Sequence, residues 1–324
     1  MKTAQAFPFR LRPFRFPDDV AALLGLLEET EAVDQSGEDI SAETIEAQLT
    51  MPPHDPALDR CVVEHPTQPG QIIGQSALWT MPASSSVLVS EMLLLVHPHW
   101  RRQHIGSALL EQALRRAHAL KADYVNTYVD TQLAASTSFL VYHHFQATAA
   151  YTEMRAQHRP RQIHMPAGFH MKPYAHIQHL PTLVEAFNNS YQGLWGHHEL
   201  SADSLQAWLP ELDTTRLFIL FDPNQVVAGI CRAEYHQQRS AKNGQATGYI
   251  DAPGLVPSYR QASLYEALLI HTINSFGEEI QLLELESWGD SPETIALYQD
   301  LGFVLLRQQH AYQRFVGMQD DDQS

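Results

Sequence analysis

The chain has 324 residues, of which 44% are hydrophobic and 18% charged, and its formal net charge is −16. This length allows two domains of ordinary size, and the composition is typical of a soluble globular protein. The negative charge argues against nucleic acid or a membrane surface as partner, because both attract basic proteins. A cationic amine is compatible with it.

The sequence also lacks the features of a secreted or membrane-spanning protein. The N-terminal residues contain no apolar core of signal-peptide length, and no run of about 18 apolar residues occurs. Cys61 and Cys231 lie in apolar, strand-like surroundings, so we expect two buried free thiols. A cytoplasmic location is therefore expected, whereas the pattern defines no oligomeric state.

The first half begins with a short strand pattern at 9–14 and a helix pattern at 20–27. Ser41 can cap a second helix. Two strands at 60–64 and 72–78 are separated by a turn and predict a hairpin.

The central stretch follows. Residues 92–96 form a continuous apolar run, which predicts a strand covered on both faces. His97-Pro98 ends it, because proline cannot donate to a ladder. After a basic turn, Leu110, Ala113 and Ala117 recur at helical spacing, which predicts an amphipathic helix. A strand at 124–129, a helix at 134–143 and a strand from Phe145 complete this half.

The order of elements then repeats at a spacing of about 160 residues. Phe9-Arg10-Leu11-Arg12-Pro13-Phe14 recurs as Phe169-His170-Met171-Lys172-Pro173-Tyr174, and the strand, hairpin and helix patterns recur after it. Each half is predicted as β-α-α-β-β-β-α-β-α-β, an α/β (α+β) fold with a mixed, mostly antiparallel sheet and helices on both faces. We expect domains at 1–156 and 167–318, a linker at 157–166 and an acidic tail at 319–324.

The junction between the central strand and its helix predicts an anion site. The first turn of a helix has unpaired N–H donors and partial positive charge. Gly106 lets a phosphate approach the backbone closely, and the turn arginines can add charge-assisted hydrogen bonds. An ordinary amphipathic helix with a solvated basic start is the alternative.

The motif Val96-x-Pro-x-Trp-Arg-Arg-x-x-Ile-Gly-Ser-Ala-Leu-Leu resembles the acetyl-CoA signature of the GNAT acetyltransferase superfamily. Arg101 and Gly106 match that signature, Arg/Gln-x-x-Gly-x-Gly/Ala, whereas His104 stands where its first glycine is usual. With the repeat, the chain resembles a tandem pair of GNAT domains. The resemblance implies that acetyl-CoA is the co-substrate and that a small-molecule or peptide amine is the acceptor. It also implies cofactor contacts from Leu94, Leu95, Val96, Arg101, Arg102, Gln103, His104, Ile105, Gly106 and Ser107.

The two halves differ at this motif. Tyr265 stands in the second half where Gly106 stands in the first, and a large side chain there should obstruct a pyrophosphate. We therefore assign acetyl-CoA to the first half. An active site in the second half is the alternative, because Tyr298 precedes Gly302-Phe303 in the spacing that the family uses for the acid that protonates the departing thiolate. A core tyrosine is the other interpretation of Tyr298.

Acetyl transfer requires a base that accepts the proton of the amine. Glu91, at the head of the central strand, is the candidate base, and a solvated strand-end carboxylate is the alternative. In the first half the family's tyrosine position holds Leu140, so Tyr142 is the candidate acid. No metal motif appears among the 18 histidines. The rival to an N-acetyltransferase is a non-catalytic acetyl-CoA-binding or interaction protein.

Overall fold

The structure is a computed structural model that describes residues 9–35, 40, 42–50, 54–84, 87–195, 197 and 199–317. Ser41 and the tail 319–324 lie outside the described residues. The chain divides into two compact units, each described by itself. Unit 1 comprises Met1–Thr148 and Ala311–Ser324, and unit 2 comprises Ala149–His310.

Unit 1 is built on a sheet with the strand order β1-β2-β3-β4-β5-β13. The pairs from β1 to β4 are antiparallel, and β4 and β5 are parallel. The strands are β1 (Arg10–Pro13), β2 (Arg60–Glu64), β3 (Ile72–Ser84), β4 (Val87–Val96), β5 (Tyr124–Asp130) and the end of β13 (Val304–Phe315).

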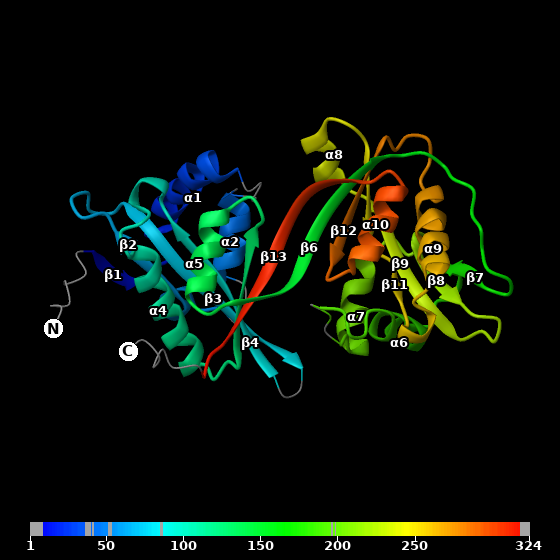
Figure 1. Ribbon diagram of the computed structural model, residues 1–324, viewed down its shortest axis with the longest axis horizontal. Coiled ribbons are helices and arrows are strands. Elements are labelled where there is room, and N and C mark those ends of the chain that lie inside the picture. The colour runs from blue at the N-terminus through cyan, green and yellow to red at the C-terminus, as the bar shows by residue number, and fades with distance from the viewer. Residues whose placement is uncertain are drawn as a thin grey trace. The chain divides into compact units, whose positions relative to one another are not determined.

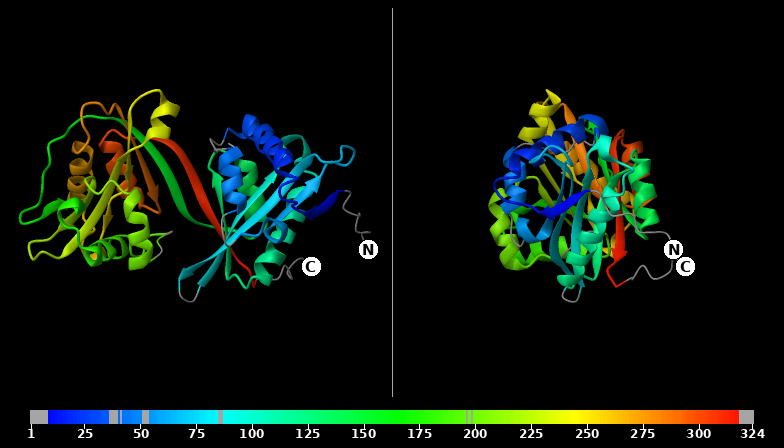
Figure 2. Two further views of the ribbon diagram at one scale, coloured as in Figure 1. Left: turned by 180° about the vertical axis from the view of Figure 1, so that it is seen from behind. Right: turned by 90° about the vertical axis from the view of Figure 1, so that its left-hand side faces the viewer.

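Helices cover both faces of this sheet, which explains the continuous apolar run in β4. Leu23 and Leu26 of α1 pack on one face together with α2, and Leu110 and Ala113 of α4 pack on the other together with α5 (Figure 1). Figure 2, seen from behind, shows α1 and α2 in blue. The helices are α1 (Val20–Asp34), α2 (Ala42–Thr50), α3 (Pro56–Asp59), α4 (Ile105–Ala119) and α5 (Ala134–Tyr142), with a 3₁₀ turn η1 (Pro98–Trp100).

Unit 2 repeats this plan with the order β6-β12-β10-β9-β8-β7, and its parallel pair is β10 and β12. All five residues of β8 are buried, because α6 and α7 cover one face of the sheet and α9 and α10 the other. The strands are β6 (Gln146–Gln157), β7 (His170–Pro173), β8 (Leu217–Phe221), β9 (Val227–Tyr235), β10 (Thr247–Asp251), β11 (Gly254–Leu255) and β12 (Leu282–Trp288). The helices are α6 (Leu180–Ser190), α7 (Ala202–Trp208), α8 (Gln237–Asn243), α9 (Ala262–Asn274) and α10 (Pro292–Asp300), with 3₁₀ turns η2 (Tyr174–His176), η3 (Leu209–Glu211) and η4 (Pro257–Tyr259).

The chain changes unit inside two strands. β6 leaves unit 1 after Thr148 and pairs with β12 from Tyr151 onward. β13 leaves unit 2 after His310, and its buried Tyr312 joins the core of unit 1. Each sheet therefore takes its last strand from the other repeat.

The compact units consequently differ from the expected boundaries of 1–156 and 167–318. The expected linker at 157–166 also lies within unit 2, where the His158 N–H donates to the Gln281 carbonyl oxygen at 2.9 Å. The repeat could not show this exchange, because β6 and β13 have the same strand character.

The predicted fold class is confirmed, since each unit has a mixed, mostly antiparallel sheet with helices on both faces. Cys61 and Cys231 are both free; Cys231 is buried and Cys61 is half-buried. Within the described ranges, no helix is long and apolar enough to cross a membrane.

Candidate functional site

The start of α4 forms the candidate anion site. The N–H groups of Ile105, Gly106 and Ser107 belong to its first turn and lack intrahelical acceptors, and no side chain caps them from His104. A β-carbon at Gly106 would lie 3.4 Å from the Phe139 ring and 3.9 Å from Val96 Cγ2. A β-carbon at Gly106 would therefore be in ordinary contact, whereas a large side chain would meet Phe139 and Val96.

The strands diverge next to this turn. β4 pairs with β5 only from Val89 to Glu91, although β4 continues to Val96. Among the described residues, the segment from Met92 to Val96 has no strand partner on the β5 side. The Val96 carbonyl oxygen accepts a hydrogen bond from Arg101 Nε, and cofactor contacts from Leu94, Leu95 and Val96 stay a prediction.

Arg101 holds the turn in place. Its Nε donates to the Val96 carbonyl oxygen at 3.1 Å, and its two terminal nitrogens form an ion pair with Asp34 at 2.8 and 2.6 Å. Arg101 thus fastens the end of α1 to the turn, whereas Arg102 and Gln103 are exposed.

The backbone of His104 has a conformation that explains why glycine is the usual residue at this position. Its φ is +63°, in the left-handed region where glycine carries no steric penalty. His144 shows the same substitution, because its φ of +61° matches the +79° of Gly302 in the other repeat. Both histidines occupy positions whose conformation favours glycine.

The corresponding cleft of unit 2 is filled by tyrosines. β10 ends at Asp251, and β11 continues the pairing with β9, without a partner on the β12 side among the described residues. The Tyr191 hydroxyl donates to the Ala252 carbonyl oxygen at 3.0 Å, and a β-carbon at Gly254 would lie 2.8 Å from the Tyr191 ring. Tyr265, at the start of α9, is buried in the core.

The arginine contact is nevertheless kept in unit 2. Arg260 Nε donates to the Leu255 carbonyl oxygen at 3.0 Å, as Arg101 does to Val96. The repeat therefore preserved the turn but closed the space beside it.

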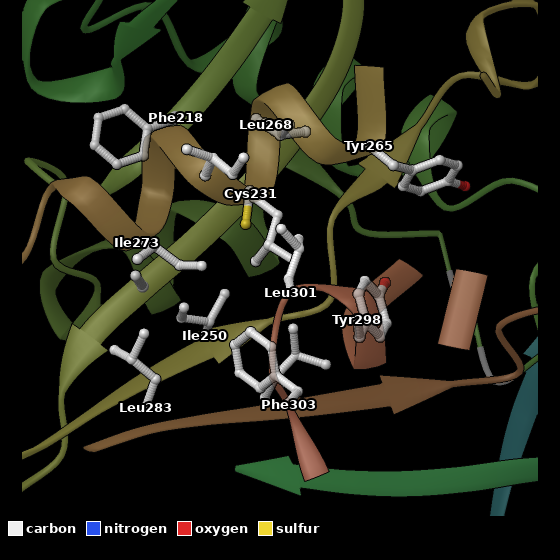
Figure 3. Close-up of a cluster of buried hydrophobic side chains, with 14 of the residues drawn as sticks. Phe218, Cys231, Ile250, Tyr265, Leu268, Ile273, Leu283, Tyr298, Leu301 and Phe303 are labelled. Carbon is white, nitrogen blue, oxygen red and sulfur yellow. The ribbon is translucent and has the colours of Figure 1, made fainter. Parts of the chain in front are cut away.

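The candidate acids lie in different surroundings. Tyr298 is a fully buried core residue beside Phe303 (Figure 3), and its hydroxyl donates to Asp290 Oδ2 at 2.8 Å. Burial raises the pKa of Tyr298 well above its usual value. In unit 1 its counterpart Leu140 is also buried, whereas Tyr142 is 65% exposed. The structure does not bring Tyr142 and Glu91 together through any described contact.

Glu91 is the centre of a polar cluster on the α1–α2 face of unit 1. Asn126 Nδ2 donates to Glu91 Oε1 at 3.1 Å, and Gln313 Nε2 donates to Asn126 Oδ1 at 3.0 Å. Tyr128 hydrogen-bonds to the Glu91 carboxylate; burial, followed by this negative charge, raises the pKa of Tyr128. Its hydroxyl therefore stays protonated at neutral pH.

Sequence reasoning missed Asn126, Tyr128 and Gln313. The alternation of β5 places Asn126 and Tyr128 on one face, which is a usable signal. Gln313 could not be found, because it arrives on the exchanged strand β13.

A hollow of about 700 Å³ lies beside the turn and is lined in part by Glu29, His97, Trp100 and Gln103. His97 Nε2 and Glu29 Oε2 are 2.7 Å apart across it. Within the described part of the chain, no group of three or more His, Cys, Asp or Glu residues is arranged to hold a metal ion.

Comparison with known proteins matches this region to a domain family. Residues 59–147 match the family model described as an acetyltransferase (GNAT) domain. This range contains Glu91, the diverging part of β4, and the turn that leads into α4. No curated protein matches the chain in sequence.

Solved structures match almost the whole chain. A GCN5-related N-acetyltransferase from Sphaerobacter thermophilus is 16% identical, with a TM-score of 0.71 over 95% of this chain and 96% of that one. A tandem GNAT protein from the clavulanic acid biosynthesis pathway is 18% identical, with a TM-score of 0.63 over 96% and 100%. A glucosamine N-acetyltransferase region of a fungal multi-domain β-N-acetylglucosaminidase is 14% identical, with a TM-score of 0.68 over 94% and 38%. At these identities the likeness concerns the fold.

Proposed function

Because the chain is a GNAT-type protein with the tandem fold, we propose that it is an N-acetyltransferase that uses acetyl-CoA, with its active site in unit 1. The acceptor is an amine of a small molecule or peptide, consistent with a net charge of −16. Neither nucleic acid nor a membrane is a partner in this proposal, and the location is cytoplasmic.

The single observation that carries the proposal is the contrast between the two clefts. Unit 1 combines a strand that diverges from its neighbour with Gly106 at a helix start, whereas Tyr191 and Tyr265 fill the same place in unit 2.

The residues of unit 1 fit acetyl-CoA. The N–H groups from Ile105 to Ser107 and the side chain of Arg102 would hold its diphosphate. The free side of β4 from Leu94 to Val96 would accompany its pantetheine arm. When bound, acetyl-CoA supplies an activated acetyl thioester.

Glu91 is the base in this proposal. Its carboxylate is oriented by Asn126 and Tyr128 and lies where β4 and β5 begin to diverge. From there it accepts the proton of the amine, directly or through a water molecule. Tyr128 remains protonated beside it and, in addition to Tyr142, is a candidate donor to the departing thiolate.

The test is release of CoA thiol from acetyl-CoA across a panel of amines, with wild type and Glu91→Gln. We expect turnover on at least one amine and a loss of about 100-fold or more in kcat for the variant, with unchanged affinity for acetyl-CoA. Glu91→Gln keeps the shape of the side chain and its contact with Asn126. Acetyl-CoA binding without turnover on any amine would instead support the non-catalytic alternative.

A further inference from the structure

A band of polar side chains crosses the α1–α2 face of unit 1, where a hydrophobic interface would be expected. The strand register aligns Arg60 with Ala77, which lies between Gln75 and Trp79 on β3, and aligns Trp79 with Glu91. Because paired residues and their i+2 neighbours share a face, Arg60, Gln75, Trp79 and Glu91 all point to the same side of the sheet.

Arg60 lies at the buried end of this band. It is 3% exposed, and its guanidinium stacks on Phe14 and Trp79, with its central carbon 5.6 and 5.5 Å from the two ring centres. The side-chain oxygen of Gln75 accepts a hydrogen bond from it. Burial lowers the pKa of Arg60 to about 10, so it remains charged at neutral pH.

This buried cation has no carboxylate partner among the described residues. Arg12, which is also buried, is held by both Asp19 and Glu64, and the buried Arg314 donates to the His143 carbonyl oxygen. Arg60 Nε and Gln75 Nε2 are buried hydrogen-bond donors that have no partner within the described ranges. Burying an unpaired charge is costly, so an anion that meets both donors would be strongly favoured there.

The neighbouring His54 adds an acceptor. Its Nδ1 is 2.7 Å from the Leu78 carbonyl oxygen, so Nδ1 carries the proton, and the buried Nε2, which has no partner, does not. Its ring stacks on Trp79 at 4.9 Å between centres. The surroundings of Trp79 thus offer two free donors and one free acceptor.

Burial decreases from Arg60 toward Glu91. Arg60 and Gln75 are buried, whereas Trp79, Glu91 and Tyr128 are half-buried. Trp79 contacts the Arg60 guanidinium and is the direct cross-strand neighbour of Glu91. A molecule lying along Trp79 would place one end at the base and the other at the cation.

We propose that Arg60 and Gln75 bind a carboxylate of the acceptor, so that the substrate is a small amine that also carries a carboxylate. This rests on the proposed function: the amine lies at Glu91 and the carboxylate at Arg60. A carboxylate accepts hydrogen bonds from both donors and neutralises the charge.

The experiment compares glycine, β-alanine and γ-aminobutyrate with methylamine, ethylamine and propylamine as acceptors. We expect kcat/KM for the best amino acid to exceed that of its carboxylate-free partner by about 100-fold or more, since buried donors are otherwise left unpaired. Arg60→Met should reduce the ratio of kcat/KM on the amino acid to kcat/KM on its carboxylate-free partner to about twofold or less, because it removes the cation that the carboxylate meets. An equal loss on both kinds of amine would overturn the proposal.

A second measurement does not depend on turnover. Sodium propionate, as a bare carboxylate, should raise the Tm of wild type but not that of Arg60→Met, because only wild type binds it. If no amine is acetylated but this difference in Tm is found, the result supports the carboxylate site and contradicts the proposed transferase activity. If an amine is acetylated but propionate raises the Tm of both proteins equally, the result contradicts the carboxylate site and supports the proposed transferase activity.

Two further variants guard against misfolding. Gln75→Met leaves Arg60 in place and should weaken the carboxylate preference about tenfold. Arg12→Met is the matched control for a buried arginine, and should lower Tm by stranding Asp19 and Glu64 without altering the preference. A carboxylate preference unchanged in Gln75→Met and Arg60→Met would contradict the proposal.

Discussion

The two units contain the same turn in different surroundings. In both, an arginine holds the carbonyl oxygen five residues before it, at 3.1 Å in unit 1 and 3.0 Å in unit 2. In unit 1 the space beside the turn borders Gly106, whereas in unit 2 Tyr191 and Tyr265 occupy it. The arginine contact is therefore present with either kind of surroundings, and the arginine alone does not indicate binding.

The largest expected effect comes from giving unit 1 the residue of unit 2. Gly106→Tyr should weaken acetyl-CoA binding by about 1,000-fold or more, since its side chain would fill the space next to Phe139 and Val96. Isothermal titration calorimetry measures this change. Gly106→Ala, whose β-carbon meets Phe139 at an ordinary 3.4 Å, serves as the folded control. Tight binding of acetyl-CoA by Gly106→Tyr would contradict the assignment of the cofactor to unit 1.

A substitution at Glu284 tests whether unit 2 stabilises the protein without binding acetyl-CoA. This buried carboxylate accepts hydrogen bonds from Arg155, Arg239 and Asn243, and the guanidinium partners outweigh burial and lower its pKa. Glu284→Gln should lower the free energy of unfolding by about 3 kcal/mol at pH 7, with unchanged acetyl-CoA affinity.

The pH dependence of that variant follows from the lowered pKa. The ionised carboxylate stabilises the protein above its unfolded pKa, and this stabilisation is lost as pH falls through the still lower folded value. Denaturant titrations should therefore show wild type and Glu284→Gln converging below about pH 4. A difference that persists unchanged into acid would contradict the assigned ion pairs.

Tyr298 distinguishes a core tyrosine from a catalytic acid. Tyr298→Phe removes the hydrogen bond to Asp290 and should cost about 1–2 kcal/mol of stability while leaving kcat unchanged. A fall of about 100-fold in kcat with normal stability would move the active site to unit 2.

The smallest effect concerns the left-handed histidine of the turn. His104→Gly should stabilise unit 1 by about 0.5 kcal/mol, because glycine adopts the φ of +63° without a steric penalty but gains freedom when unfolded. Thermal unfolding measures this change. His104→Ala is the matched control and should destabilise instead.

Local pattern predicted most of the fold. The unbroken apolar run of β4 and the helical spacing of Leu110, Ala113 and Ala117 each have one interpretation, because burial on two faces or along one stripe dictates them. The hairpins and the order of elements in both repeats follow for the same reason.

Contacts between residues that are far apart in the sequence could not be predicted. Nothing in the residues distinguishes β6 from β13 as the last strand of unit 1, so neither the exchange nor Gln313 beside Asn126 was foreseeable. The unpaired Nε of Arg60 was not foreseeable either, because whether a buried arginine has a partner among the described residues depends on all its neighbours in the fold.

The exchanged strands also bear on how the protein is made. While the nascent chain leaves the ribosome, the sheet that carries Glu91 lacks its bordering strand until residues 311–315 have been translated. Any truncation that removes the C-terminus would take away part of the first unit, not only the second. Assembly of the proposed active site is thereby delayed until both repeats have been translated.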